Sequence, residues 1–215
     1  MLRLVVTFGA LGPAERVFGQ SSKRLRVVGF AGASNVPLWV GQERGFFAQQ
    51  GVEPVFEITP NSVEMVRNLY EGRFDLAFSS VDNVIAYDEG QGEAGLTSNP
   101  DFVALFGIDD GMLSLVAAPE IRSIADLKGK TVSVDAMTTG FAFVLRAMLA
   151  NAGLAEADVV FSKVGGGAQR LQALLRGEQT ATLLSAPLDC MAVSKGFVRL
   201  ATARSAMVPF KAASA

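Results

Sequence analysis

The hydrophobic and polar positions of this 215-residue chain alternate between two periods. Short runs of aliphatic and β-branched residues, typical of buried strands, are followed by polar turns. After each turn, apolar residues recur every three or four positions, as in amphipathic helices. Strands are expected at 25–30, 54–58, 74–78, 131–134, 159–164 and 180–184. This alternation predicts an α/β fold of mainly parallel sheets flanked by helices, with ligands at the carboxyl ends of the strands.

Residues 131–152 show the pattern most clearly. A β-branched run at 131–134 predicts a strand, a polar turn follows, and apolar residues then recur at helical spacing. This geometry directs the first N–H groups of the helix beyond the end of the strand, where Thr138 and Thr139 can cap them. Two interpretations stay open here. Either the turn binds a small anionic or polar ligand, or the two threonines are ordinary helix caps.

The alternation is interrupted between residues 102 and 118. Two apolar segments, 102–108 and 112–118, are interpreted as strands that only Asp109, Asp110 and Gly111 separate. A connection this short makes the strands antiparallel, or the second strand enters another sheet, as where a chain crosses between lobes. The two aspartates are interpreted as a solvated turn rather than a carboxylate pair for acid–base catalysis.

Four segments of the chain follow from this pattern. We expect a leader over 1–24, a first lobe over 25–110, a second lobe over 111–201 and an irregular tail over 202–215. Residues 1–19 contain one early arginine and a short apolar run, and are interpreted as a secretory signal cleaved after Gly19. The run is too short to span a membrane. Export predicts a periplasmic or extracytoplasmic location, the alternative being a mis-assigned start or a cytosolic extension.

Composition argues against several functions. The 19 basic and 21 acidic residues include no long basic block, which argues against nucleic-acid binding. Histidine is absent from the sequence, so imidazole metal sites and histidine-based nucleophile pairs cannot form within it. The single cysteine, Cys190, lies in an apolar stretch that predicts a buried, inert thiol. We therefore expect no catalytic residue, no cofactor and no metal.

Four segments, in order, resemble the ABC-transporter solute receptors of the sulfonate/nitrate/thiamine-precursor (SsuA/THI5-like) group. They are PLWVGQERGFFAQQGV at 37–52, GRFDLAFSSVDNV at 72–84, SIADLKGKTVSVDAMTTG at 123–140 and LQALLRGEQTATLLSAP at 171–187. The resemblance implies the two-lobed type II periplasmic binding fold, in which each lobe is a mainly parallel sheet flanked by helices. It also implies that the ligand lies between the lobes.

The resemblance further implies the ligand, the partner and the site. The ligand is expected to be a small polar or anionic solute of the sulfonate, nitrate, pyrimidine or carboxylate type, which a monomeric receptor delivers to an ABC permease in the membrane. For four residues there is a structural alternative to ligand binding: Ser34 and Asn35 form a turn, and Ser80 or Asp82 caps a helix. The implied ligand-binding residues are Ser34, Asn35, Ser80, Asn83, Thr138, Thr139 and Ser185.

Two other functions use the same scaffold. A thiamine-pyrimidine synthase-like enzyme relies on histidine and a cysteine-rich segment, and the sequence has neither. A ligand-sensing effector domain of a transcription regulator needs a DNA-binding helix-turn-helix ahead of residue 25, which the first 24 residues cannot hold. Members of the family return to the first lobe after the second and are longer. The resemblance therefore implies a truncated receptor with an incomplete first lobe, exposed apolar surface and weak binding.

Overall fold

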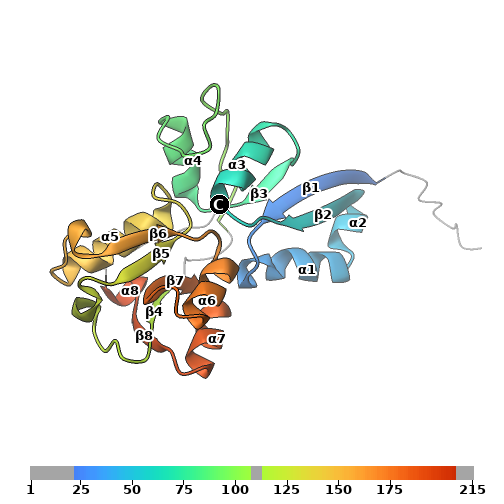
Figure 1. Ribbon diagram of the computed structural model, residues 1–215. Coiled ribbons are helices and arrows are strands. Elements are labelled where there is room, and N and C mark those ends of the chain that lie inside the picture. Colours follow the sequence, from blue (N-terminus) through green and yellow to red (C-terminus); the bar gives the residue numbers. More distant parts are fainter. Residues whose placement is uncertain (1–21, 108–112, 207–215) are drawn as a thin grey trace, which may run out of the picture.

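A computed structural model describes residues 22–107 and 113–206, which form two α/β lobes (Figure 1). The first lobe, coloured blue to green in Figure 1, contains a parallel sheet with the strand order β2-β1-β3. Its strands are β1 (Lys23–Gly29), β2 (Val52–Ile58) and β3 (Leu76–Phe78). Its helices are η1 (Ala33–Asn35), α1 (Val36–Glu43), α2 (Phe46–Gln49), α3 (Ser62–Tyr70) and α4 (Val81–Asp88).

The second lobe contains a sheet of five strands in the order β6-β5-β7-β4-β8. Strand β5 is parallel to β6 and β7, whereas β4 is antiparallel to β7 and β8. The strands are β4 (Leu113–Ala117), β5 (Thr131–Val134), β6 (Val160–Lys163), β7 (Ala181–Ser185) and β8 (Val198–Thr202). The helices are η2 (Ile124–Leu127), α5 (Gly140–Asn151), η3 (Glu156–Asp158), α6 (Gly167–Leu175), α7 (Leu188–Ser194) and α8 (Ala203–Ala206).

Hydrophobic packing is concentrated in the second lobe. Helix α5 buries Leu145, Met148 and Leu149, which follow the helical period, against Val132 and Val134 of β5. The opposite face of the sheet is covered by α6 and α7, whose leucines pack with Val116 and Leu184. The first lobe has a smaller core, in which Val28, Met65, Val66, Tyr87 and Ala94 are buried. The two-lobed α/β fold predicted from the sequence is confirmed.

The segment 102–108 was predicted to be a strand, and this prediction is wrong for residues 102–107, whereas residue 108 lies outside the described residues. Residues 101–107 have no regular secondary structure. The exposed fractions of Val103, Leu105 and Phe106 are 72%, 65% and 60%, so these apolar side chains are not buried in a sheet, and the outer edge of β3 has no partner among the described strands. Strand β4 belongs to the second sheet, as one of the two alternatives expected. Asp109, Asp110 and Gly111 lie outside the described residues.

Two further expectations differ from the structure. Cys190 is exposed rather than buried, because the short helix α7 turns Asp189 and Ala192 toward the core instead. The segment expected to be an irregular tail begins with the last residue of β8, Thr202, and continues into α8. The predicted signal segment 1–19 and the residues beyond 206 lie outside the described part of the chain. Among the described residues, no helix has the length and apolar character needed to cross a membrane.

Candidate functional site

A cavity of about 390 Å³ lies between the two lobes. Its walls are the turns that follow β1 and β3 in the first lobe and β5 and β7 in the second, together with the first residues of α6. Aromatic side chains of Phe30, Phe78 and Phe141 form much of its apolar surface. A larger cavity of about 550 Å³ lies within the first lobe, between α3, β3 and residues 99–106. We consider the smaller cavity the candidate site, since polar groups from both lobes converge on it.

Five of the seven predicted ligand-binding residues line this cavity. They are Ser34, Ser80 and Asn83 from the first lobe, and Thr139 and Ser185 from the second. These residues are up to 151 positions apart in the sequence, and the strand ends bring them together, as the α/β pattern indicates. Their role as ligand contacts stays a prediction.

The other two predicted residues lie away from the lining of the cavity. Asn35 is fully buried, and its Nδ2 donates to the carbonyl oxygen of Phe30 at 2.7 Å. Its Oδ1 atom is also buried and has no hydrogen-bond partner. Thr138 donates its backbone N–H to the carboxylate of Glu93 at 3.1 Å. Both residues therefore hold the turns that frame the cavity.

The capping alternatives can be judged from the helix starts. Ser80 and Thr139 occupy the N-cap positions of α4 and α5, but neither side chain accepts a hydrogen bond from its helix. The Thr139 hydroxyl donates instead to the carbonyl oxygen of Ala136 at 3.1 Å. Asp82 does not cap α4 either, because its carboxylate accepts the backbone N–H of Gly140 in the other lobe. The side chains of Ser80 and Thr139 thus have a different role from N-terminal capping.

Arg170 is a buried cation at the cavity that our sequence reasoning missed. Its side chain is 3% exposed and lies near the ring of Phe141, with 5.8 Å between Cζ and the ring centroid. The guanidinium donates to Thr182 Oγ1 at 3.1 Å, and to the carbonyl oxygens of Gly165 at 2.7 Å and Leu183 at 3.1 Å. Burial lowers the pKa of Arg170 to about 10, so the group stays charged at neutral pH.

The position of Arg170 in α6 could have indicated from the sequence that this residue is buried. It precedes Leu171 and lies four residues before Leu174, so it falls on the apolar face of the helix. A charged residue on such a face is rarely left without polar partners. The identity of the neutral partners could not be read from the sequence, because they come from β7 and from the turn before α6.

Asp135 is the second charged residue of the cavity wall. Its Oδ2 atom accepts the backbone N–H of Ser62 from the first lobe at 3.0 Å. Its Oδ1 atom is buried without a hydrogen-bond partner. The negative charge of Asp135 raises the pKa of Arg170 and so partly opposes the effect of burial. Asp135 and Arg170 therefore bring an anion and a cation to the same cavity.

The lobes also meet through backbone hydrogen bonds beside the cavity. Ala33 donates its N–H to the carbonyl oxygen of Ala186 at 3.2 Å, and Gly166 donates to that of Pro60 at 2.7 Å. The first contact joins the turn after β1 to the turn after β7, and the second joins the turn after β2 to the start of α6. The cavity is therefore closed by main-chain contacts on two sides.

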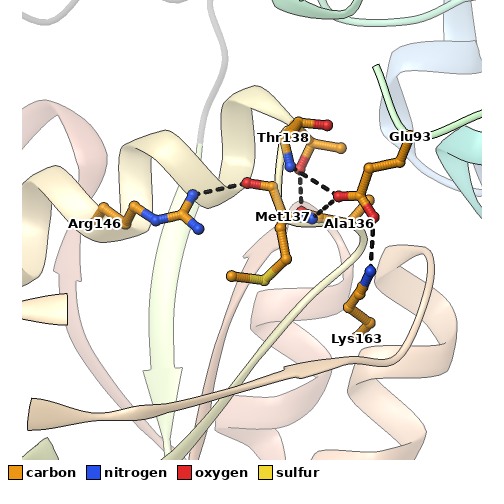
Figure 2. A network of polar contacts seen from close by, with 7 residues as sticks. Glu93, Ala136, Met137, Thr138, Arg146 and Lys163 are labelled. Atoms are coloured by element: carbon orange, nitrogen blue, oxygen red, sulfur yellow. Dashed lines mark hydrogen bonds and ion pairs between the residues drawn. The ribbon is translucent and has the colours of Figure 1, made fainter. Parts of the chain in front are cut away.

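A polar network joins the lobes at the start of α5 (Figure 2). Glu93 of the first lobe accepts the backbone N–H groups of Met137 and Thr138 with Oε1, and its Oε2 lies 2.7 Å from Lys163 Nζ. Arg146 donates to the carbonyl oxygen of Met137 at 2.8 Å, from the side away from Glu93 (Figure 2). Burial opposes ionisation of Glu93, but the hydrogen bonds from Lys163 and the backbone outweigh it, so its pKa lies below the ordinary value.

Three solved binding proteins have a fold similar to that of this chain. The alkanesulfonate-binding protein SsuA from Xanthomonas axonopodis pv. citri, bound to MOPS, is 17% identical and has a TM-score of 0.69, over 89% of this chain and 65% of that one. The periplasmic nitrate-binding protein NrtA from Synechocystis PCC 6803 is 15% identical with a TM-score of 0.75, over 89% of this chain and 55% of that one. The periplasmic aliphatic sulphonate-binding protein SsuA from Escherichia coli is 16% identical with a TM-score of 0.60, over 90% of this chain and 65% of that one.

The chain thus spans between 55% and 65% of the length of these three relatives. No curated protein sequence matches the chain. A family model, described as NMT1/THI5 like, matches residues 33–188, which cover parts of both lobes and include all the residues predicted for the site. The chain belongs to the NMT1/THI5-like family.

Proposed function

We propose that the protein captures a small solute in the cavity between its lobes and acts, without catalysis, as the extracytoplasmic receptor of an ABC importer. The observation that carries this proposal is the convergence of polar side chains from both lobes on one cavity at the ends of the strands. A volume of about 390 Å³ suits a small organic molecule. Two similar structures are named for the binding of alkanesulfonates and of nitrate, which supports a small solute.

The chemistry of the wall supports reversible binding. Hydroxyl groups of Ser34, Ser80 and Ser185 can donate and accept hydrogen bonds, and aromatic rings cover the apolar part of a ligand. A solute that contacts both lobes binds the closed arrangement better than the open one, and so shifts the equilibrium toward closure. A membrane permease can recognise the closed form.

A synthase-like enzyme on the same scaffold is the alternative. Such an enzyme needs a nucleophile or an acid–base group that faces the substrate. The charged side chains of the cavity wall are Asp135 and Arg170, and three of the N–H donors of the arginine are already hydrogen-bonded to the protein. Within the described residues, no three His, Cys, Asp or Glu side chains are grouped as a metal site requires. This arrangement favours binding over catalysis.

A titration with variants from both lobes tests the proposal. Thermal-shift screening against sulfonates, nitrate, pyrimidines and small carboxylates selects a solute, whose affinity is then measured by calorimetry. Ser80→Ala and Ser185→Ala should each weaken binding, since they remove a hydroxyl from opposite walls of the cavity. Gln172→Ala, on the exposed side of α6, is the matched control and should bind as the unaltered protein does. Equal affinity in all three variants would refute a site between the lobes.

A further inference from the structure

The turn at residues 137–140, which we call the α5 turn, has the character of an anion site. Helix α5 is 12 residues long, and the backbone N–H groups at its start carry the positive end of the helix dipole. Two carboxylates from the first lobe already occupy this turn. Glu93 accepts the N–H groups of Met137 and Thr138, and Asp82 accepts that of Gly140.

The chain is shaped for this contact. A Cβ atom at Gly140 would overlap with the carboxyl group of Asp82, so only glycine allows the approach. The other carboxylate, that of Glu93, forms an ion pair with Lys163 from β6, with 2.7 Å between Oε2 and Nζ. The two acids lie 44 and 58 positions before the N–H groups that they accept, in the other lobe. These contacts are therefore interlobe contacts and differ from local helix caps.

The charges next to the α5 turn disfavour an anionic solute. Asp82, Glu93 and Asp135 bring three carboxylates to the turn and the adjoining cavity wall. Of the three cations nearby, Lys163 pairs with Glu93, Arg146 pairs with Glu156, and only Arg170 has no carboxylate partner among the ion pairs of the described residues. The carboxylates of Asp82 and Asp135 would repel an anionic solute, and more strongly in a partly buried site than in water. In addition, the buried Oδ1 of Asp135 is an acceptor without a partner, which suits a solute that donates a hydrogen bond.

We propose that Asp82 and Glu93 are the resident anions of the α5 turn. They hold the lobes together in the absence of a solute and deny the turn to an anionic solute, so that the cavity takes a neutral or positively charged molecule with N–H donors. The first part, in which the two carboxylates hold the lobes together, is called the clamp below and does not depend on any solute. The second part, the class of solute, rests on the function proposed above.

The clamp is tested by the distance between the lobes without any solute. Cys190 is exposed in the second lobe, and Gln50→Cys adds an exposed second site in the first lobe, so that a pair of spin labels can report the separation. We expect one narrow distribution for this labelled protein. Asp82→Asn combined with Glu93→Gln should shift the distribution to longer distances and broaden it. Glu89→Gln, an exposed glutamate in the same part of the chain, is the matched control and should change nothing.

A purely structural role predicts a different result. If the carboxylates act only as caps of α5, the double variant lowers the melting temperature but leaves the distance between the lobes unchanged, which would overturn the clamp. Lys163→Gln serves as a milder variant, since its side chain is 58% exposed and its loss does not threaten the core. It should move the distribution in the same direction by a smaller amount. An unchanged distance in that folded variant and in the double variant refutes the proposal.

The class of solute is tested with three probes of the same shape: benzamidine, benzamide and benzoate. They carry a positive charge, no charge and a negative charge, and the first two donate N–H bonds. Benzamidine and benzamide should raise the melting temperature of the unaltered protein, and benzoate should do so only in the double variant. Stabilisation of the unaltered protein by benzoate as large as by the other two would refute the exclusion of anions. If no probe and no screened solute stabilises any variant, the proposed function fails, whereas the distance measurement still decides the clamp.

Discussion

The backbone N–H of Gly166 in the second lobe donates a hydrogen bond to the carbonyl oxygen of Pro60 in the first lobe, at 2.7 Å. A Cβ atom at position 166 would lie 3.0 Å from that oxygen and 2.9 Å from Cδ1 of Phe30, both of them in the first lobe. The missing side chain therefore sets how closely the lobes approach each other beside the cavity.

Gly166→Ala should consequently separate the lobes. The φ of −62° and ψ of 171° at this position suit alanine, so the effect is steric and leaves the backbone unstrained. We expect solute affinity to fall by about tenfold, which corresponds to ~1.4 kcal/mol. Calorimetry with the solute selected by screening measures this, with the exposed Gln169→Ala on the same helix as control. Unchanged affinity would show that the lobes close without this contact.

The two threonines of the α5 turn should differ in their effect on binding. Thr139 lines the cavity, whereas Thr138 contributes its backbone N–H to Glu93 and does not line it. Thr139→Ala should therefore weaken solute binding by about tenfold, and Thr138→Ala should leave it nearly unchanged. Comparison of the two affinities by calorimetry decides the point. Equal losses in both variants would contradict the assignment of the cavity wall.

Arg170 should be important for the stability of the second lobe. Arg170→Met removes three hydrogen bonds and leaves the acceptors at Gly165, Thr182 and Leu183 buried. We expect the free energy of unfolding to fall by roughly 2–4 kcal/mol. Urea denaturation measures the change. Arg176→Met, which removes only an exposed pair with Glu178, is the control and should have little effect. A small loss at position 170 would contradict a structural role for the guanidinium.

Stability should also depend on the ionisation of Glu93. Its pKa is lower in the folded protein than the ordinary 4.5, so its contribution is present above the unfolded pKa and is lost as the pH falls through the folded pKa. Lys163 and Tyr87 are the titratable groups that interact with it, and burial raises the pKa of Tyr87 above its ordinary value of 10, outside this acid range. Urea denaturation between pH 7 and about pH 3 should therefore show a shallower decline in Glu93→Gln than in the unaltered protein. Parallel curves would show that Glu93 adds nothing to the pH dependence of stability.

The exposed apolar side chains of residues 102–107 should bind a hydrophobic dye. Val103, Leu105 and Phe106 are mostly exposed and lie over the cavity within the first lobe. A patch of this kind binds the dye ANS in the native state. Replacing all three by serine should lower the fluorescence and leave the melting temperature nearly unchanged, because few contacts are lost. Equal fluorescence in the variant would place the dye elsewhere.

Sequence periodicity predicted the elements around the cavity because the local pattern determines them. The β-branched run of β5 and the buried stripe of α5 appear where expected, and glycine ends both α3 and α6 after Tyr70 and Leu175. The turns that hold Ser80, Thr139 and Ser185 follow from the strand ends. These features depend on residues close together in the chain.

The features that were missed depend on distant residues. The segment 102–107 has the composition of a strand but pairs with none of the described strands, and Cys190 is exposed because α7 turns Asp189 and Ala192 toward the core. Asp82 and Glu93 resemble ordinary surface acids in the sequence, and only the approach of the second lobe gives them the α5 turn as partner. Periodicity cannot reveal such contacts.

Hydrogen exchange measured by mass spectrometry, with and without the selected solute, tests the central proposal most directly. A solute between the lobes should slow exchange at the same time in residues 30–37 and 78–83 of the first lobe and in residues 135–141 and 185–188 of the second. Protection confined to one lobe, or centred on residues 99–106 at the other cavity, would contradict binding between the lobes.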